Sequence, residues 1–491
     1  MTHTDFLKPV VNLKFYAIAT TQDNVIISLD KIVINEAQIL HNSYQIENSI
    51  VSYMMFGSSG IRGIANERIT PELALNVGLA VGSLYKSAVI GHDPRTASEM
   101  IEHAIISGLI ACGCDVTRVG LVSTPTLSYA ARNCECGVMI TASHNTSEYV
   151  GIKLWNKDGT SFNTFQQREI ESLIGQDDGC SSYSGERANW NKIANVSIND
   201  RAISDHMSKV LTEIGPSKLK VVVDCGSGSG STITPYILRE MGCKVITLNA
   251  QPDGFFPARH PEPTEQNLEL LIEAVRAFNA DLGIAHDGDA DRMMGVDRGG
   301  RYISGDQMLA LFGLKEAKKS IVYPIDVSLM VDDVIDSEIF KTRIGDVYVA
   351  EEIKRVDADF GGESSGSWIF PRVSYCPDGI YAAARIVSIA EKEVLSDIFS
   401  TFPTYNIKRG SILYDEGTNV MDPIEKELKS LDFNKITTID GVRLDFEDGW
   451  ILIRSSGTEP KIRITAEARG DEQAEKLYEK ALNIIKRCVQ C

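Results

Sequence analysis

Short apolar runs that end in polar, glycine-rich loops recur along the chain, and segments with helical spacing lie between them. The apolar runs cover residues 88–91, 137–141, 219–224, 244–249, 282–285 and 320–324, and the helical segments include 99–112 and 267–279. Strands that alternate with helices predict β-α-β units, which form parallel sheets with helices on both faces. The pattern predicts an α/β fold with three units of this kind.

The C-terminal part follows a different pattern. Residues 450–454 and 462–467 predict two strands around a short loop, and residues 470–488 alternate apolar and charged positions at helical spacing. We expect a smaller α+β domain there. The predicted boundaries are 54–204 for domain I, 205–304 for domain II, 305–404 for domain III and 405–491 for domain IV.

Residues 1–53 contain no chemical motif, and Met54 and Met55 then open the segment MMFGSSGIRG, which resembles a natural protein start. We expect residues 1–53 to be a disordered or loosely packed leader, or the product of a start codon assigned too early. The alternative is a small additional element that docks on domain I.

Composition limits the class of protein. The chain has 491 residues, 43% of them apolar, which excludes a disordered protein. Neither a membrane-spanning run nor a secretory signal is visible, so we expect a cytoplasmic protein without a membrane partner. The formal charge of −18 argues against a nucleic-acid partner, because phosphates attract a basic surface. An anionic ligand would therefore need a local cationic pocket.

The ten cysteines are expected to be reduced thiols, since no signal peptide directs the chain to an oxidising compartment. Cys112/Cys114 and Cys134/Cys136 form C-x-C pairs, whereas structural zinc sites usually use C-x₂-C spacing. The pairs are better interpreted as small buried hydrophobic residues.

Asp287, Asp289 and Asp291 alternate with small residues in DGDADR, directly after an apolar strand. Three carboxylates so close together repel one another unless a cation lies among them, and hard oxygen ligands favour magnesium, manganese or calcium. An EF-hand is excluded because its sixth and twelfth positions are Arg292 and Arg298 here. The motif predicts a metal site at a strand end, where open α/β sheets bind ligands.

Residues 137–145, GVMITASHN, place Ser143 and His144 in a polar loop after an apolar strand. Taken alone, an ordinary turn explains this loop equally well. Beside the metal loop, a serine oxygen becomes a candidate phosphoryl carrier.

Residues 454–463, RSSGTEPKIR, combine a hydroxyl-rich turn with Arg454 and Arg463. Free backbone N–H groups in such a turn bind anions, and arginine adds forked, charge-assisted hydrogen bonds to phosphate. An ordinary hairpin turn is the alternative. The segment predicts the local cationic pocket that an anionic ligand would need on this acidic protein.

Residues 361–366, GGESSG, contain the G-x-S-x-G pattern of a hydrolase nucleophile elbow. That mechanism needs a histidine later in the chain, but all eight histidines lie at or before His286. The hydrolase hypothesis therefore fails, and Glu363 with its neighbouring hydroxyls suits binding of sugar hydroxyls.

Residues 226–230, GSGSG, also follow a strand and suggest a dinucleotide fingerprint. The third glycine of G-x-G-x-x-G would fall on Ser231, and no acidic residue lies about 20 positions further on until Asp253. A tight strand-to-helix turn is the better interpretation.

Together, and in order, these motifs resemble the α-D-phosphohexomutase superfamily: FGSSGIRG (residues 56–63), TASHN, DGDADR, GESSG and RSSGTEP. The resemblance covers residues 54–491. It implies three similar α/β/α domains with mixed, mostly parallel sheets and a smaller fourth domain around a central cleft. It also implies an isomerase and phosphoprotein that moves phosphate between C6 and C1 of a hexose.

The resemblance implies roles for particular residues. Ser143 would be the phosphoserine, Lys153 the general acid/base, and Arg62 and His144 further catalytic residues. One Mg²⁺ per chain would be bound by Ser143, Asp287, Asp289 and Asp291. The substrate would be held by Arg292, Glu363, Ser365, Arg454, Ser456, Gly457, Thr458 and Arg463.

The sequence departs from the family pattern at Thr146, where proline is usual, at Val150, where asparagine is usual, and at Ser367, where histidine is common. These departures concern loop rigidity and sugar selectivity. Residues 342–349 (TRIGDVYV) and the FGSSGIRG opening are most similar to the archaeal-type phosphoglucosamine mutases and phosphomannomutases.

We therefore expect interconversion of glucosamine 6-phosphate and glucosamine 1-phosphate, with glucose or glucosamine bisphosphate as intermediate or activator. The alternatives are a phosphomannomutase/phosphoglucomutase, a nicotinamide-dependent enzyme and a sugar-phosphate sensor without activity. The expected partner is a small sugar phosphate, and the chain would act as a monomer or homodimer.

Overall fold

The computed structural model describes residues 55–57, 59–177, 180–414, 420–456 and 461–489. The chain divides into two units at Met54/Met55, and the description that follows concerns the second. The predicted leader, residues 1–53, lies outside the described residues. Within the part described, no helix combines the length and the apolar character needed to cross a bilayer.

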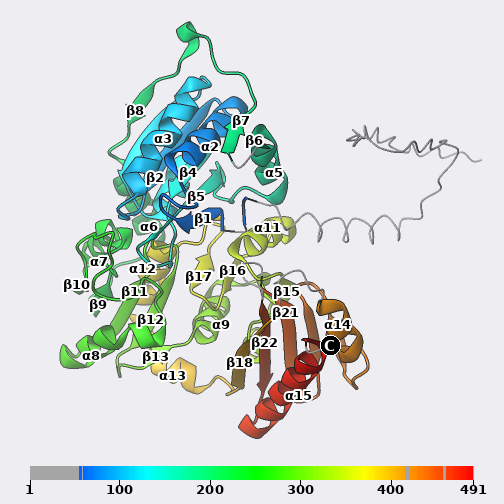
Figure 1. Cartoon of the computed structure of the whole chain (residues 1–491). Coiled ribbons are helices and arrows are strands. Elements are labelled where there is room, and N and C mark those ends of the chain that lie inside the picture. Colours follow the sequence, from blue (N-terminus) through cyan, green and yellow to red (C-terminus); the bar gives the residue numbers. More distant parts are fainter. Residues whose placement is uncertain (1–54, 58, 178–179, 415–419, 457–460, 490–491) are drawn as a thin grey trace, which may run out of the picture. The chain divides into compact units, whose positions relative to one another are not determined.

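The first sheet has the strand order β1-β5-β4-β2-β3-β8 (Figure 1). Its strands are β1 (Ile61–Ile64), β2 (Ser87–His92), β3 (Asp115–Leu121), β4 (Cys136–Ile140), β5 (Tyr149–Asn156) and β8 (Val196–Ile198). Helices α2 (Pro71–Leu84), α3 (Ser98–Ala111), α4 (Thr124–Ala131) and α5 (Thr164–Leu173) accompany it. A separate two-stranded sheet pairs β6 (Ile174–Asp177) with β7 (Cys180–Tyr183).

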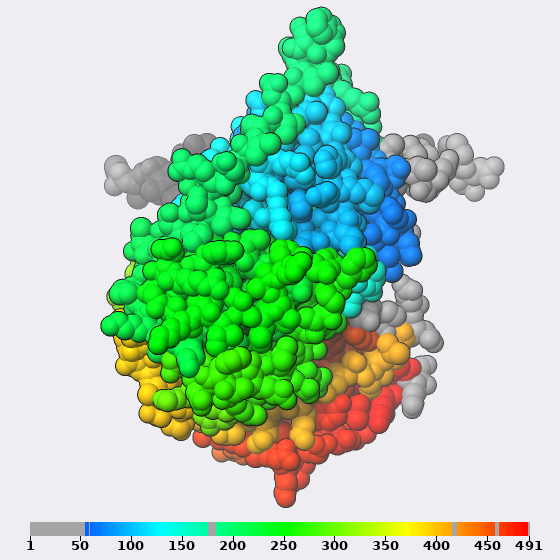
Figure 2. Space-filling view, turned by 90° about the vertical axis from the view of Figure 1, so that its left-hand side faces the viewer, coloured from blue at the N-terminus to red at the C-terminus, as the bar shows by residue number. Residues whose placement is uncertain are grey.

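Alternate side chains of β2 explain why helices cover both faces of this sheet. Ala88 and Ile90 join one apolar cluster together with α2 and α3, whereas Val89 joins a second cluster with α4. The segment 184–199, which contains β8 and a 3-10 turn at Trp190–Lys192, runs along the outer surface of these layers (Figure 2). The apolar strands predicted at 88–91 and 137–141 are confirmed.

The second sheet has the order β10-β9-β11-β12-β13, and the third has the order β15-β14-β16-β17. The strands of the second are β9 (Lys220–Asp224), β10 (Lys244–Leu248), β11 (Leu282–His286), β12 (Met293–Asp297) and β13 (Tyr302–Ile303). Those of the third are β14 (Ser320–Pro324), β15 (Glu338–Thr342), β16 (Phe360–Glu363) and β17 (Ser367–Ile369).

Helices pack on both faces of these two sheets. They are α6 (Ala202–Glu213), α7 (Thr234–Glu240), α8 (Glu269–Ala277), α9 (Gly305–Glu316), α10 (Leu329–Val334), α11 (Asp346–Val356), α12 (Gly379–Ala390) and α13 (Leu395–Ser400), with 3-10 turns at Ser229–Thr232 and Glu265–Asn267. One large apolar cluster, which includes Leu282 and Ile321, is shared by both sheets. The predicted helix at 267–279 is present as α8.

The same four-strand pattern occurs in all three sheets. Three parallel strands are followed by one antiparallel strand: β3-β2-β4 by β5, β10-β9-β11 by β12, and β15-β14-β16 by β17. Three similar α/β/α units with mixed, mostly parallel sheets are therefore confirmed. The polar loops after β4, β11 and β16 lead into antiparallel partner strands and are hairpin connections.

The fourth sheet is entirely antiparallel, in the order β18-β22-β21-β20-β19. Its elements are β18 (Asn406–Leu413), α14 (Met421–Leu428), β19 (Lys435–Thr437), β20 (Val442–Asp445), β21 (Gly449–Ser455), β22 (Lys461–Ala468) and α15 (Asp471–Val489). Ile451 and Ile453 face the helices, whereas Trp450 and Leu452 face Ile325 in the loop after β14. The smaller α+β domain is confirmed.

Candidate active site

Ser143 lies in the hairpin loop after the fully buried strand β4. Its backbone φ of 48° is in the left-handed region, which an L-residue with a side chain rarely adopts without support. Its hydroxyl donates to Oδ2 of Asp287 at 2.6 Å, and its side chain is almost completely buried. The serine loop of the first sheet therefore contacts the aspartate loop of the second.

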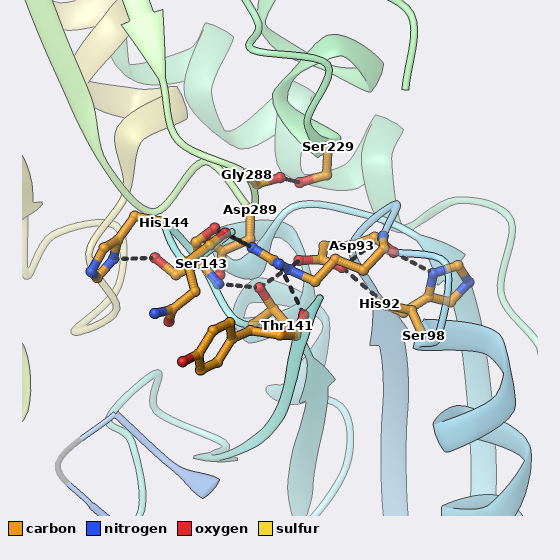
Figure 3. A network of polar contacts seen from close by, with 12 residues as sticks. His92, Asp93, Ser98, Thr141, Ser143, His144, Ser229, Gly288 and Asp289 are labelled. Carbon is orange, nitrogen blue, oxygen red and sulfur yellow. Dashed lines mark hydrogen bonds and ion pairs between the residues drawn. The ribbon is translucent and has the colours of Figure 1, made fainter. Parts of the chain in front are cut away.

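Arg95 supports the serine loop, whose residues Thr141, Ser143 and His144 are shown with Asp93 in Figure 3. Its guanidinium donates, at 2.5–2.9 Å, to the backbone carbonyls of Ser143, Asn145, Thr146 and Tyr149. The guanidinium also lies 4.9 Å from the ring centroid of Phe256. Because Arg95 is buried, these interactions satisfy its donors and hold the strained loop in one conformation.

Asp93 connects this support to the nucleophile position. Its carboxylate accepts from Arg95, Ser98 and Thr141 at 2.8–3.0 Å. The hydroxyl oxygen of Thr141 in turn accepts from the backbone N–H of Ser143 at 2.8 Å. Hydrogen bonds to both the backbone N–H and the backbone carbonyl of Ser143 therefore fix its position.

The aspartate loop joins β11 to β12, and its three carboxylates offer oxygen atoms within 4.8 Å of one another. Thr124 donates to Oδ2 of Asp289 at 2.5 Å and ties this loop to the first sheet. Gly288 allows a close approach, since a Cβ there would lie 2.6 Å from the carbonyl oxygen of Ser143. In the described part of the chain this is the one group of three or more His, Cys, Asp or Glu side chains suited to a metal ion.

The donor set fits a divalent cation. Among the described residues, Oδ1 of Asp289 and Oδ1 of Asp291 are buried without a hydrogen-bond partner. The pKa of Asp287 is raised well above its usual range by burial and by the negative charges of Asp291 and Asp289. The pKa of Asp291 is raised to about 7, again by burial and by Asp289. A bound cation would supply the missing partner and relieve this repulsion.

Two arginines, Arg62 and Arg292, act on the serine loop. Arg62, on β1, donates to Asn145 at 3.3 Å, and its buried Nε has no partner among the residues described. The pKa of His144 is lowered, first by the charge of Arg292 and then by burial and by Arg62, so this imidazole stays neutral. Its Nδ1 lies 3.3 Å from the hydroxyl oxygen of Ser143. The local charge is suited to an anion such as a phosphoryl group.

Lys153, on β5, forms an ion pair with Asp346, the first residue of α11, at 2.6 Å. Both side chains are almost completely buried. Although burial alone would lower the pKa of Lys153, Asp346 and Asp291 outweigh it and raise that pKa. Lys153 is therefore an ammonium ion in this arrangement.

Glu363 ends β16 and accepts from the backbone N–H of Gly345 at 2.8 Å. Burial and then the nearby Asp346 raise its pKa to about 8. The hairpin loop that follows meets the aspartate loop through a β-bridge between Arg292 and Ser367. Ser365, in this hairpin loop, is exposed.

A cavity of about 340 Å³ lies beside the fourth sheet. Its lining includes Arg409, Ser411, Arg454, Lys461, Arg463 and, from the loop after β14, Asp326. Arg454 and Arg463 are direct neighbours across β21 and β22. The backbone N–H of Ser456 donates to the carbonyl of Lys461 at 2.8 Å. Gly457 and Thr458, predicted to bind phosphate, lie outside the described residues.

The structure connects the predicted residues through contacts that span three sheets: Ser143 with Asp287, Arg292 with Ser367, and Lys153 with Asp346. Sequence reasoning missed Arg95, Asp346 and Arg409 as parts of the site. Arg409 stands two positions before Ser411 on one strand, a spacing that could have suggested a shared face. Asp346 lies within the TRIGDVYV segment but was given no role there, and Arg95 lies in no motif; only the fold brings their side chains to the site.

Two other sequence interpretations can now be assessed. Ser229, in the glycine-rich turn at 226–230, donates its backbone N–H to the carbonyl of Gly288 at 2.9 Å, so this turn supports the aspartate loop. Eight of the cysteines, which include both C-x-C pairs, are free thiols.

Comparison with known proteins shows the family. Models of the phosphoglucomutase/phosphomannomutase family match in chain order: α/β/α domain I at residues 53–179, domain II at 202–300, domain III at 304–405, and the C-terminal domain at 415–484. The chain belongs to the phosphoglucomutase/phosphomannomutase family.

Within the family, the chain is 56% identical over 442 residues to a probable phosphoglucosamine mutase from Methanosarcina acetivorans, covering 89% of this chain and 100% of that protein. It is 40% identical over 448 residues to a phosphoglucosamine mutase from Methanococcus maripaludis, covering 88% and 98%. A solved phosphoglucomutase/phosphomannomutase family protein from Burkholderia thailandensis matches with a TM-score of 0.77 at 25% identity, covering 88% and 98%.

Proposed function

We propose that this protein is a phosphohexomutase that interconverts hexose 6-phosphates and hexose 1-phosphates through a phosphoserine at Ser143. The observation that carries the proposal is the 2.6 Å contact between the Ser143 hydroxyl and Asp287, one of three clustered carboxylates. A serine oxygen beside a cation site and two arginines suits phosphoryl transfer, which depends on positioning and charge neutralisation more than on covalent chemistry.

Ser143, Asp287, Asp289 and Asp291 would hold one Mg²⁺, which would neutralise part of the roughly two negative charges of a phosphoryl group. Arg62 supports the same anion with its unpartnered Nε. Neutral His144 can donate or accept one hydrogen bond at the Ser143 oxygen. Lys153 would act as acid/base near the reacting sugar hydroxyl.

The substrate would lie against the loops of the second, third and fourth sheets. Glu363 and Ser365 would bind ring hydroxyls, and Arg292 would contact the substrate where the second and third hairpin loops meet. The non-reacting phosphate would be held by Arg454, Ser456, Gly457, Thr458 and Arg463. The cavity lined by Arg454 and Arg463 supports this assignment.

The reaction would proceed in two balanced transfers. The phosphoryl group leaves Ser143 for a sugar oxygen, so that one P–O bond breaks and another forms. The attacking sugar hydroxyl gives up its proton, the released serine oxygen takes one up, and the sugar bisphosphate results. After the intermediate turns around, its other phosphate returns to Ser143. Glucose or glucosamine bisphosphate would serve as intermediate and as activator of a serine that lacks phosphate.

We propose glucosamine 6-phosphate as the preferred substrate. The two phosphoglucosamine mutases, at 56% and 40% identity over nearly their full length, support it. So does Glu363, because a C2 ammonium beside it would stabilise the ionised form of this carboxyl group, whose pKa is raised to about 8 in the ligand-free site. Side activity on glucose or mannose phosphates is expected, since one substituent discriminates by only about 10- to 200-fold.

Steady-state assays with the three sugar phosphates, with and without the matching bisphosphate, test the proposal. We expect the highest kcat/KM for glucosamine phosphate, and a Ser143→Ala variant that loses several orders of magnitude in kcat but still binds sugar phosphate. A tenfold preference for mannose 1-phosphate would make the protein a phosphomannomutase. Binding without any turnover of the wild-type protein would indicate a sensor.

A further inference from the structure

The ion pair between Lys153 and Asp346 joins two separate sheets. Lys153 lies on β5 of the first sheet, and Asp346 begins α11 of the third. The lysine nitrogen is 2.6 Å from Oδ2 of Asp346 and 4.6 Å from the ring centroid of Trp155. The side chains are only 5% and 12% exposed, so solvent screens this interaction little.

The groups that face Lys153 come from four places. Asp346 on α11 is the nearest, and Asp291 of the aspartate loop also favours the ammonium form. Arg62 of β1 opposes it, and Cys376 lies close enough for its thiol to be influenced by the lysine. The carboxylate of Asp346 and the aromatic face of Trp155 both stabilise the charged lysine. Because Asp346 is charged and in direct contact, it is the main reason why this buried amine keeps its proton.

Asp346 also lies next to the predicted sugar contact. The preceding residue, Gly345, donates its backbone N–H to Glu363 at 2.8 Å. The start of α11 is therefore connected both to the sugar loop and to the lysine on the first sheet.

A second ion pair links the same two elements and provides a comparison. Lys354, further along α11, contacts Asp158 in the loop after β5 at 2.5 Å. Its side chains are 54% and 33% exposed, and neither residue belongs to the site. Both ion pairs connect α11 to β5 or to the loop that follows it, but only the pair of Lys153 and Asp346 includes a candidate reactive group.

We propose that Asp346 is a positioning residue that holds Lys153 as an ammonium ion, so that this acid/base residue acts from its acid form, as a cationic hydrogen-bond donor to the reacting oxygen. The inference rests on the proposed function, which places Lys153 at the reacting hydroxyl. A phosphoryl-transfer transition state that is largely dissociative requires little deprotonation of the attacking hydroxyl, so a permanent cation is compatible with the reaction.

The test compares Asp346→Asn with Lys354→Gln, which breaks the exposed pair between the same elements. We expect Asp346→Asn to lower kcat increasingly as the pH rises from 7 to 10, by up to about tenfold per pH unit above the lowered pKa of Lys153. KM should change much less. Lys354→Gln should keep the wild-type kcat and pH profile, and Asp346→Glu should restore part of the loss.

A loss of kcat by Asp346→Asn that is equal at every pH, or an activity that rises with pH relative to the wild type, would overturn the proposal. The same would follow if both variants behaved alike, since the pair would then only join the sheets. Acylation of Lys153 at pH 9, measured by peptide mass spectrometry, gives a readout without turnover. It should be faster in Asp346→Asn than in the wild type, and an equal rate would contradict the proposal even if the mutase assignment failed.

Discussion

Arg454 and Arg463 lie directly opposite each other on the antiparallel strands β21 and β22. Ser411 on β18 continues the same row, opposite Arg463. Two like charges in this relation normally destabilise a sheet by a few tenths to about 1 kcal/mol. Arg463 forms no ion pair with any of the described residues, and an anion in the adjoining cavity would neutralise both guanidinium groups.

This relation predicts opposite effects on stability and on binding. Arg463→Gln should raise the melting temperature of the ligand-free protein slightly, because it removes the repulsion with Arg454. It should weaken binding of hexose 6-phosphate by about 10- to 100-fold, since a hydrogen bond to a charged group contributes about 1.5–3 kcal/mol. Calorimetric titration and thermal unfolding measure both effects.

Arg487→Gln is the control, because it removes an exposed arginine on α15 that pairs with Glu427. It should leave substrate binding unchanged. Equal binding by Arg463→Gln and the wild type would exclude Arg463 from the phosphate site.

Removal of metal should abolish turnover and lower stability. A cation that binds only the folded state at 100 times its Kd stabilises that state by about 2.7 kcal/mol. We therefore expect Mg²⁺ to raise the melting temperature of the chelator-treated protein and to restore its activity. Asp289→Asn should lose most of this thermal response, whereas Asp205→Asn, at an exposed position on α6, should retain it. Full activity after exhaustive chelation would remove the three aspartates from the mechanism.

Glu363 should make stability depend on pH. Its pKa is raised from 4.5 to about 8, so between these values the folded state keeps a proton that the unfolded state has lost. The wild-type protein should therefore lose stability relative to Glu363→Gln as the pH rises from 5 to 8. The difference should exceed ~1.4 kcal/mol, the equivalent of one pKa unit. Parallel stability curves for the two proteins would show that Glu363 is ionised in the folded state.

A chain that begins at Met55 should fold and turn over like the full-length protein. The family models begin at residue 53, and the Methanosarcina relative aligns over its whole length with 89% of this chain. Melting temperature and kcat of the shortened chain test this expectation. An insoluble or inactive product would show that residues 1–54 contribute to the fold.

Local sequence patterns predicted the elements that carry the site because each motif follows a short apolar strand. Asp287 and Ser143 could be placed at strand ends in this way, and Trp450 and Ile462 could be assigned to strands by their apolar neighbours. The direction of the next strand could not be predicted, since a loop of three to eight residues gives no signal that separates a hairpin from a helix. The four domain boundaries remain predictions.

Partners that are distant in sequence could not be predicted. Asp346 is 193 residues from Lys153, and Arg95 is 48 residues from Ser143. Neither separation corresponds to a helix or strand repeat, so each contact depends on how the sheets and loops pack. The sequence could not predict the left-handed backbone conformation of Ser143 either, because serine does not favour that conformation.

The hairpin loops after β4, β11 and β16 occupy the same topological position in three successive units, and in the proposed function each would have a different chemical role. Because both ends of every loop are fixed by paired strands, its length and sequence can vary without altering the sheet beneath it. Three similar sheets thus carry three different loops, and one loop can be exchanged without changing the other two. If the first two units carry phosphoryl transfer, as proposed, replacing the third loop with that of a relative of another sugar preference should change the sugar specificity and leave phosphoryl transfer unaltered.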